Sequence, residues 1–261
     1  MELYYRHYGR GVPFIILHGL FGLSDNWVSF ARRLADRYEV FIPDQRNHGR
    51  SPHDAEFNYP VLVNDLYEFM ETHSLHHPVI LGHSMGGKVA MHFALSRPQM
   101  LKALIVADIS PGTYGHGYRH RRMIDAVMAV DTENAKTRSD VEQQLMKKIE
   151  EERVRKFLMK NLYRRKDDGF AWRINVNAIS NNLENIFDGV HSEKTFDKPT
   201  LFIRGEKSDY IKYNDFDLIY RHFPQADIVT IEGAGHWLHA EKPDEFYNIV
   251  NNFLRRYCPA G

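Results

Sequence analysis

The chain has 261 residues, 43% of them hydrophobic, which is enough for one sizeable core, and its 34 basic residues balance its 34 acidic ones. This balance argues against a general nucleic-acid binder, which would carry an excess of basic residues. A single cysteine, Cys258, excludes an intramolecular disulfide and a cysteine-ligated metal cluster, and it suits a reducing compartment.

Export and membrane signals are missing from the sequence pattern. The first residues lack the basic-then-apolar order of a signal peptide, and no apolar run approaches the roughly 18 residues of a membrane span. We therefore expect a cytoplasmic protein without a membrane-spanning segment.

Apolar runs of strand length alternate with helical patterns in the first part of the chain. The expected strands cover residues 2–8, 12–17, 39–43, 79–81 and 101–107, and the expected helices cover residues 27–34, 60–73 and 85–97. Residues 119–190 then carry charged helical patterns with no strand signal. The alternation resumes with strands at 198–205 and 226–231 and helices at 214–222 and 243–257. This order predicts an α/β fold: a mostly parallel sheet flanked by helices, with a helical cap inserted at about 112–195.

A serine stands at the turn from the central predicted strand into a helix. Gly82-His83-Ser84-Met85-Gly86 has the pattern G-x-S-x-G, in which the glycines permit a turn too tight for a β-carbon. Ser84 is thereby exposed at a helix N-terminus, where unpaired N–H groups favour a developing anion. The strand before the motif and the helix after it make this a specific signal.

Reactive side chains follow several of the predicted strands. His18, Ser84 and Asp108 each come directly after a strand, and His236 lies in a glycine-rich loop after the last one. Ligands bind beyond the carboxyl ends of such strands, so we expect these groups to converge. A serine needs a base to take its proton and a carboxylate to orient that base. His236 is the candidate base for Ser84.

Four segments together resemble the α/β-hydrolase fold family, and within it the small bacterial YbfF-type esterases and their mitochondrial relatives. They are residues 18–22, 44–51, 82–87 and 233–243. The resemblance spans nearly the whole chain and is densest outside the predicted cap. It implies serine hydrolysis of carboxylic esters or acyl thioesters, without a cofactor or metal, with Ser84 as the nucleophile and His236 as the base.

The fold that the chain resembles builds its oxyanion hole from two backbone N–H groups. One is expected from Met85, which follows the nucleophile. The other is expected from Leu20, with Phe21 as the less favoured alternative, and the side chains of both are expected to line an acyl pocket. His18 and His48 are expected to brace loops by hydrogen bonding, and His83 to pack under the turn at Ser84.

The acid has two candidates. Many α/β-hydrolases place it three residues after the glycine that ends the penultimate strand, where this chain has Ser208, with Asp209 one position later. The YbfF-type esterases resemble this chain in having a serine at this position. The resemblance implies that the acid is instead an aspartate after the preceding core strand. The matching residue is Asp108, which we favour. Asp209 remains the alternative, with a turn or helix-cap role as its other interpretation.

The predicted cap is locally positive between residues 119 and 166, with clusters at 153–156 and 164–166. Either it attracts an anionic substrate head, such as the phosphates of an acyl-CoA, or it is an ordinary solvated helix face.

We interpret the whole chain as a serine esterase or thioesterase with Ser84, His236 and Asp108. The alternatives are a carbon–carbon-bond hydrolase or perhydrolase on the same fold, and a ligand-binding protein with vestigial hydrolase activity. The natural substrate, its acyl length and the oligomeric state stay open.

Overall fold

The computed structural model describes residues 1–113, 117–166 and 168–259, and within them seven strands form one sheet. Its order is β1–β3–β2–β4–β5–β8–β9, and all neighbours are parallel except β1, which pairs antiparallel with β3. This confirms the predicted mostly parallel sheet. The strands are β1 (Tyr5–Tyr8), β2 (Val12–Leu17), β3 (Tyr38–Pro43), β4 (Val79–His83), β5 (Ala103–Ala107), β8 (Thr200–Gly205) and β9 (Ala226–Ile231).

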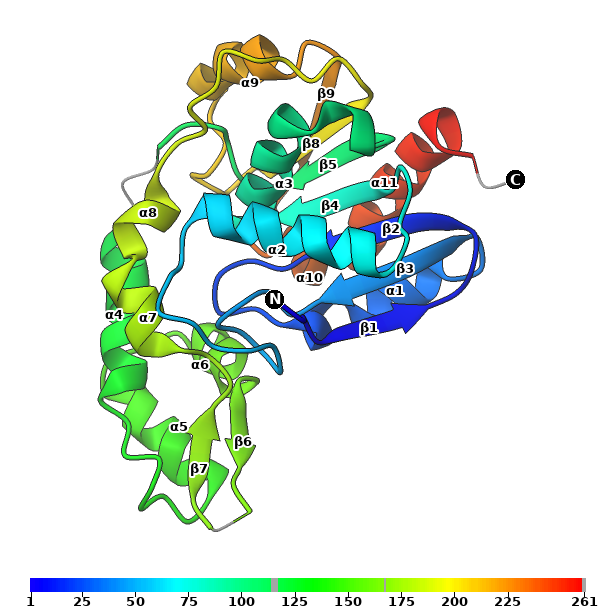
Figure 1. Cartoon of the computed structure of the whole chain (residues 1–261). Coiled ribbons are helices and arrows are strands. Elements are labelled where there is room, and N and C mark those ends of the chain that lie inside the picture. Colours follow the sequence, from blue (N-terminus) through cyan, green and yellow to red (C-terminus); the bar gives the residue numbers. More distant parts are fainter. Residues whose placement is uncertain (114–116, 167, 260–261) are drawn as a thin grey trace.

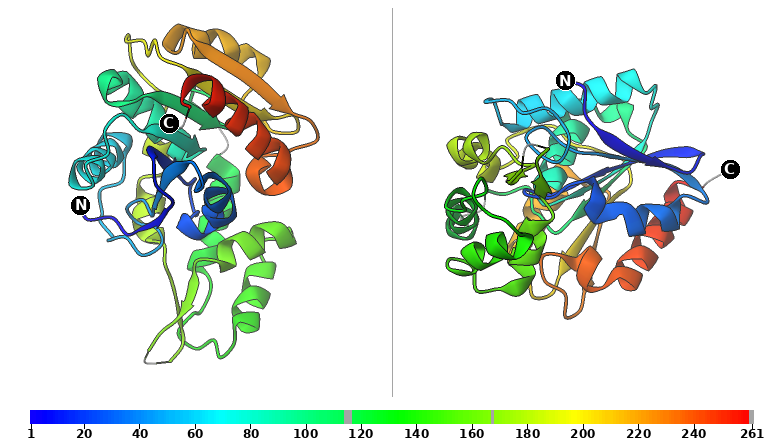
Figure 2. Two further views of the ribbon diagram at one scale, coloured as in Figure 1. Left: turned by 90° about the vertical axis from the view of Figure 1, so that its right-hand side faces the viewer. Right: turned by 90° about the horizontal axis from the view of Figure 1, so that it is seen from below.

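Helices cover both faces of the sheet. Figures 1 and 2 show α2 (Tyr59–Thr72) and α3 (Met85–Ser96) on one face, and α1 (Val28–Leu34) and α11 (Pro243–Tyr257) on the other. Strand β2 illustrates why the buried strands are continuously apolar. Its residues Phe14 and Ile16 join the core on the α1 and α11 side, while Ile15 and Leu17 join the core on the α2 and α3 side.

Outside residues 112–195, the other helices of the described chain are short. Three are 3-10 helices, and two α-helices follow the late strands of the sheet. These five are η1 (Ser24–Trp27), η2 (Pro98–Met100), η3 (Tyr213–Asp215), α9 (Phe216–His222) and α10 (Leu238–Glu241). None of the helices within the described ranges combines the length and apolar character needed to cross a bilayer.

We call residues 112–195 the inserted segment, because it lies between β5 and β8 and extends away from the sheet in Figure 1 (green to yellow). Residues 114–116, part of its predicted boundary, lie outside the described residues. The segment contains α4 (Gly117–Met128), α5 (Arg138–Met146), α6 (Glu152–Met159), β6 (Leu162–Arg164), β7 (Phe170–Trp172), α7 (Val176–Asn181) and α8 (Leu183–Phe187).

Lys88 of α3 joins the two ends of the inserted segment. Its ammonium donates hydrogen bonds to the carbonyl oxygens of Pro111 (3.1 Å) and Gly112 (2.6 Å) at one end, and of Asp188 (2.8 Å) at the other. Burial lowers the pKa of Lys88 to about 7. The buried lysine therefore fixes where the segment leaves the sheet and where it returns.

The prediction that residues 119–190 contain no strand is wrong. Strands β6 and β7 form a small antiparallel hairpin, with Leu162 opposite Trp172 and Arg164 opposite Phe170. Each strand has only three residues, so neither is long enough to show the alternation by which strands are recognised.

The strand order changes direction at β2. The chain passes from β2 to β3 on one side and then returns to place β4 on the other side of β2. Loops leaving the carboxyl ends of β2 and β4 therefore diverge and leave a crevice, the usual ligand position in an open α/β sheet. Leu20 follows β2 and Ser84 follows β4, so both border this crevice.

Candidate active site

Ser84 sits on the tight turn between β4 and α3. Its backbone has φ 53° and ψ −120°, which a non-glycine residue rarely adopts. A β-carbon on Gly82 would lie 2.2 Å from the carbonyl oxygen of Gly86, and one on Gly86 would lie 2.4 Å from that of Leu17. The two glycines of the motif are thus required by the close approach of backbone, as the sequence predicted.

Asp108 directly follows β5 and also has a positive φ, 54°. Its side chain is fully buried, and its carboxylate accepts hydrogen bonds from three donors. These are the Gly205 N–H (2.9 Å), the Ser208 hydroxyl and the Nδ1–H of His236 (2.8 Å). A buried carboxylate is costly unless it is hydrogen-bonded in this way, so the three donors explain how an aspartate is tolerated here.

His236 is held on three sides. Its Nδ1 donates to Asp108, which leaves Nε2 as the proton-accepting nitrogen. Its backbone carbonyl accepts a hydrogen bond from the Nε2 of His83, at 2.8 Å. Its ring stacks on Tyr210, with centroids 3.9 Å apart and planes inclined by 19°. Burial and the Asp108 charge raise the pKa of Tyr210, so the stacked phenol stays neutral.

Ser84 and His236 line the same cavity, next to each other in the site. His83, the neighbour of Ser84, has its ring centroid 4.7 Å from that of His236. Among the described residues the Ser84 hydroxyl makes no hydrogen bond, and the ring of His236 is bonded to Asp108 and not to Ser84. The hydrogen bond between a nucleophile and its base commonly tightens only when substrate is bound. The arrangement brings together the predicted nucleophile, base and favoured acid.

The two predicted oxyanion donors also border Ser84. Met85 begins α3, where its N–H has no partner within the helix. The Leu20 N–H has no acceptor among the described residues, whereas the Phe21 N–H is already donated to the Nε2 of His48, at 3.1 Å. A β-carbon on Gly19 would lie 3.1 Å from that of Ser84, so the loop approaches the serine closely. This geometry favours Leu20 over Phe21.

Hydrogen bonds fix the direction of the Leu20 N–H. The carbonyl of the same peptide, that of Gly19, accepts from the His18 Nδ1 and from the Gly22 N–H, both at 2.9 Å. In a planar trans peptide the N–H points opposite to the carbonyl, so these bonds orient the Leu20 donor. His18 also accepts from the Gln45 N–H at 3.0 Å, which holds the loop against the sheet.

His18 and His48 both act as neutral braces. His48 donates from Nδ1 to the Arg46 carbonyl and accepts from Phe21 at Nε2. Burial lowers the pKa of His18 to about 4 and that of His48 to about 3. Both imidazoles have their two nitrogens engaged with backbone groups, which agrees with the bracing role predicted for them.

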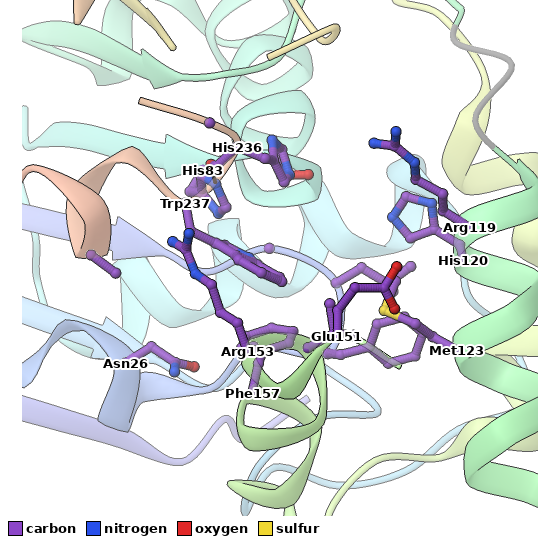
Figure 3. Close-up of a pocket in the computed structure, with 18 of the residues that line it drawn as sticks. Asn26, His83, Arg119, His120, Met123, Glu151, Arg153, Phe157, His236 and Trp237 are labelled. Atoms are coloured by element: carbon purple, nitrogen blue, oxygen red, sulfur yellow. Dashed lines mark hydrogen bonds between the residues drawn. The ribbon is translucent and has the colours of Figure 1, made fainter. Parts of the chain in front are cut away.

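A cavity of about 660 Å³ opens over these residues, a size typical of sites for small organic ligands. Figure 3 shows Arg119, His120 and Met123 of α4 on the side opposite His236, with Arg153 and Phe157 of α6 beneath Trp237. Leu20 and Phe21 line it as well, and their role in an acyl pocket stays a prediction. The inserted segment therefore supplies much of the cavity wall.

Half of the arginine and lysine side chains that line the cavity are already paired with carboxylates. Arg122 pairs with Glu151 (3.0 Å), Arg153 with Glu241 (2.7 Å) and Lys156 with Glu152. Arg155, in the cluster singled out from sequence, is buried instead and donates to the carbonyls of Ile149 and Glu150. In the described parts of the chain, the cavity-lining cations without an ion pair are Arg119, Lys160 and Lys207.

Asp209, the alternative acid, is exposed and does not line the cavity. Its carboxylate makes no hydrogen bond or ion pair with any described residue, and it lies in a bend rather than at a helix cap. Asp108 is therefore the carboxylate in contact with His236. Cys258 is buried at the end of α11 and does not line the cavity.

Several residues of the site gave no sufficient signal in the sequence. Ser208 stood out only as a position without an acid, although its hydroxyl bonds to Asp108. Tyr210 and Glu241 contact the loop of His236, the first by stacking and the second by accepting the Gly235 N–H at 2.7 Å. In the sequence, Tyr210 is marked only as an aromatic residue two positions after Ser208, and Glu241 only as a glutamate within the segment 233–243.

Comparisons with known proteins find a family and relatives that match most of the chain. The alpha/beta hydrolase fold family matches residues 12–243. The chain is 40% identical to the sn-1-specific diacylglycerol lipase ABHD11 of Danio rerio, over 95% of this chain and 80% of that protein. It is 36% identical to esterase YbfF of Escherichia coli strain K12, over 93% and 92%. Among solved structures, a marine microorganism esterase is 45% identical, with a TM-score of 0.95 and coverage of 97% and 99%.

Proposed function

Since this chain belongs to the α/β-hydrolase fold family, we propose that it is a serine hydrolase that cleaves carboxylic esters or acyl thioesters through an acyl-enzyme on Ser84. The relatives named as esterases and lipases support this chemistry. The observation that carries it is the contact of the His236 Nδ1 with the buried Asp108 carboxylate, which leaves Nε2 free as a base beside Ser84.

In the proposed reaction Ser84 attacks the acyl carbonyl carbon while the Nε2 of His236 takes the hydroxyl proton. The negative oxygen of the tetrahedral intermediate accepts from the N–H groups of Met85 and Leu20. The intermediate collapses, and the alcohol or thiol leaves with the proton from His236. Water, deprotonated by His236, then attacks the acyl-enzyme, and the second tetrahedral intermediate releases the acid as the proton passes from His236 back to the Ser84 oxygen. Asp108 holds the imidazole in the required tautomer and stabilises the imidazolium that forms twice.

Burst kinetics test this function. With p-nitrophenyl butyrate we expect a rapid release of p-nitrophenol, equal to the amount of enzyme, followed by slower turnover, and no burst from Ser84→Ala. A ligand-binding protein with vestigial activity would release no stoichiometric burst. Profiling esters, acyl-CoAs and diketones would then separate an esterase or thioesterase from a carbon–carbon-bond hydrolase, and oxidation assays with peroxide would reveal a perhydrolase.

We further propose that residues 112–195 act as a cap over the site and that the cavity-lining cations without an ion pair favour substrates with an anionic head, such as an acyl-CoA. Arg119, Lys160 and Lys207 line the cavity without an ion pair within the described chain, which supports this preference. The test compares an acyl-CoA with a neutral ester of equal acyl length in the Arg119→Gln, Lys160→Gln and Lys207→Gln variants. Arg121→Gln, on the same helix but outside the cavity lining, is the control. An unchanged ratio of the two activities would remove the anionic-head proposal and leave the esterase intact.

A further inference from the structure

Asn161 reaches from the inserted segment into the loop that carries the candidate oxyanion donor. It lies between α6 and β6, and its Nδ2 donates to the carbonyl of Phe21 at 2.8 Å, 140 positions away in sequence. The residue is fully buried. Its own backbone is fixed on both sides, because its N–H donates to Leu158 (2.9 Å) and its carbonyl accepts from Arg173 (2.8 Å).

This contact begins a chain of aligned peptide groups. Asn161 donates to the carbonyl of the Phe21–Gly22 peptide, and the N–H of that peptide donates to the Gly19 carbonyl at 2.9 Å. The Gly19 carbonyl belongs to the peptide whose N–H is that of Leu20. Each donor is therefore on the same peptide unit as the preceding acceptor, so the dipoles point the same way. Such chains polarise one another, which strengthens the terminal donor.

The loop needs external support to keep this shape. Phe21 has φ 61°, a left-handed conformation that costs a non-glycine residue free energy unless its surroundings impose it. Its N–H is held by His48 from the core, and its carbonyl is held by Asn161 from the inserted segment. The Oδ1 of Asn161 has no partner within the described residues, so the side chain's polar contact is the one to Phe21.

We propose that Asn161 is a positioning residue for the oxyanion site: it aligns and polarises the Leu20 N–H through the Phe21 and Gly19 peptides. The inference rests on the proposed function, because it assigns a role in stabilising the tetrahedral intermediate. It also makes the docking of the inserted segment part of the catalytic geometry. If the segment moved away from the sheet, the Asn161 donor would be withdrawn from the Phe21 carbonyl.

The alternative role for Asn161 is anchorage of the inserted segment alone, and a second asparagine provides the control. Asn182 also belongs to the inserted segment, and its Nδ2 donates to the carbonyl of Ala55, at 3.0 Å. This bond has the same chemistry and also joins the segment to the core, but it ends on a loop outside the cavity lining. Asn182→Leu therefore removes an anchor without touching the oxyanion loop.

The experiment compares Asn161→Leu with Asn182→Leu and the native protein by stopped-flow acylation with p-nitrophenyl butyrate. We expect Asn161→Leu to lower the acylation rate constant about tenfold or more, with the dissociation constant of the ester changed by less than about twofold. Its affinity for a trifluoromethyl ketone, which forms a tetrahedral adduct, is expected to fall by the same factor as acylation. Asn182→Leu is expected to leave both quantities unchanged.

Thermal unfolding establishes that each variant is folded, and Asn161→Ala, which introduces no bulk, replaces the leucine variant if that one does not fold. The proposal is overturned if the Asn161 variant acylates as fast as the native protein, if its ketone affinity is unchanged, or if Asn182→Leu shows an equal loss. Failure of the proposed function would look different, because the native protein itself would then show no acylation.

Discussion

The Asp108 carboxylate lies 2.8 Å from the Nδ1 of His236, although 128 positions separate the two residues in the chain. The aspartate is completely buried at the end of β5, and the histidine comes from the loop after β9. Because Nδ1 is occupied as a donor, the imidazole presents Nε2 to the cavity that Ser84 also lines. The chemistry proposed for this site depends on that contact.

Removing the Asp108 charge should therefore be far more damaging than removing that of Asp209. Asp108→Asn is expected to lower kcat about 10³- to 10⁴-fold, because an asparagine amide favours the wrong tautomer of the His236 imidazole and carries no charge to stabilise the imidazolium. Asp209→Asn should retain native kcat, since its carboxylate is exposed and bonds to no described residue. Steady-state kinetics on a p-nitrophenyl ester measure both. A large loss in the Asp209 variant and none in the Asp108 variant would assign the acid to Asp209.

Ser208 should support the same carboxylate. Its hydroxyl donates to the Oδ2 of Asp108, the oxygen that also contacts His236. A hydrogen bond to a charged group contributes about 1.5 kcal/mol or more, so Ser208→Ala is expected to lower kcat/KM about tenfold. Ser110→Ala is the matched control, because this buried hydroxyl accepts from Gly112 and does not contact Asp108. Equal kinetics for the two variants would show that the Ser208 bond contributes nothing to activity.

The ion pair between Arg153 and Glu241 links α6 to α10, which follows the loop of His236. Glu241 accepts from Arg153 with one oxygen and from the Gly235 N–H with the other, and Arg153 also lies over Trp237, 5.0 Å from its centroid. Arg153 is half exposed, so Arg153→Ala should reduce kcat/KM by less than about fivefold. Glu241→Ala should cost more, because it also releases the residue before His236, and Glu241→Gln should fall between native and alanine. The three variants are compared in one steady-state assay, and an Arg153 effect larger than that of Glu241→Ala would contradict this order.

The buried histidines should make the fold sensitive to acid. Burial lowers the pKa of His48 to about 3 and of His18 to about 4, so between about pH 6.5 and these values the unfolded chain binds protons that the folded chain does not. The free energy of unfolding therefore falls as pH falls through this window, by about 1.4 kcal/mol per pH unit for each such group. His48→Gln keeps an acceptor for the Phe21 N–H but cannot titrate. Urea unfolding of this variant at pH 4.5, 5.5 and 6.5 should show an unfolding free energy that depends on pH less steeply than in the native protein, by about 1.4 kcal/mol per pH unit. An unchanged pH dependence would contradict the neutral assignment of His48.

The sheet and the strand ends could be predicted because their signals are local. The bounds of β2, β9 and α11 match the expected ranges, since each is a long apolar or amphipathic run closed by turn residues. The glycines around Ser84 predicted the tight turn for a steric reason. In the structure, a β-carbon on Gly82 or Gly86 would lie only 2.2 or 2.4 Å from a backbone carbonyl oxygen. These features depend on a few neighbouring residues and on nothing distant.

The parts that escaped prediction depend on how distant segments dock. The strands β6 and β7 are too short to show the alternation of polar and apolar residues by which strands are recognised. Nothing in the sequence near Asn161 or Arg153 indicates that they bond to Phe21 and Glu241. The basic cluster at 153–156 illustrates the limit of counting charges. In the structure Arg155 turns inward to backbone carbonyls and Arg153 is held by Glu241, so composition alone overstated the free positive charge.

Labelling with a fluorophosphonate tests the central claim most directly, because this probe forms a covalent bond only with a serine activated as a nucleophile. We expect peptide mass mapping of the native protein to locate one adduct on Ser84. The label should be absent from Ser84→Ala, slowed strongly in Asp108→Asn and His236→Gln, and unaffected in Asp209→Asn. Labelling of Ser84→Ala at the native rate, or an adduct on another residue of the native protein, would contradict the assignment of Ser84 as the nucleophile.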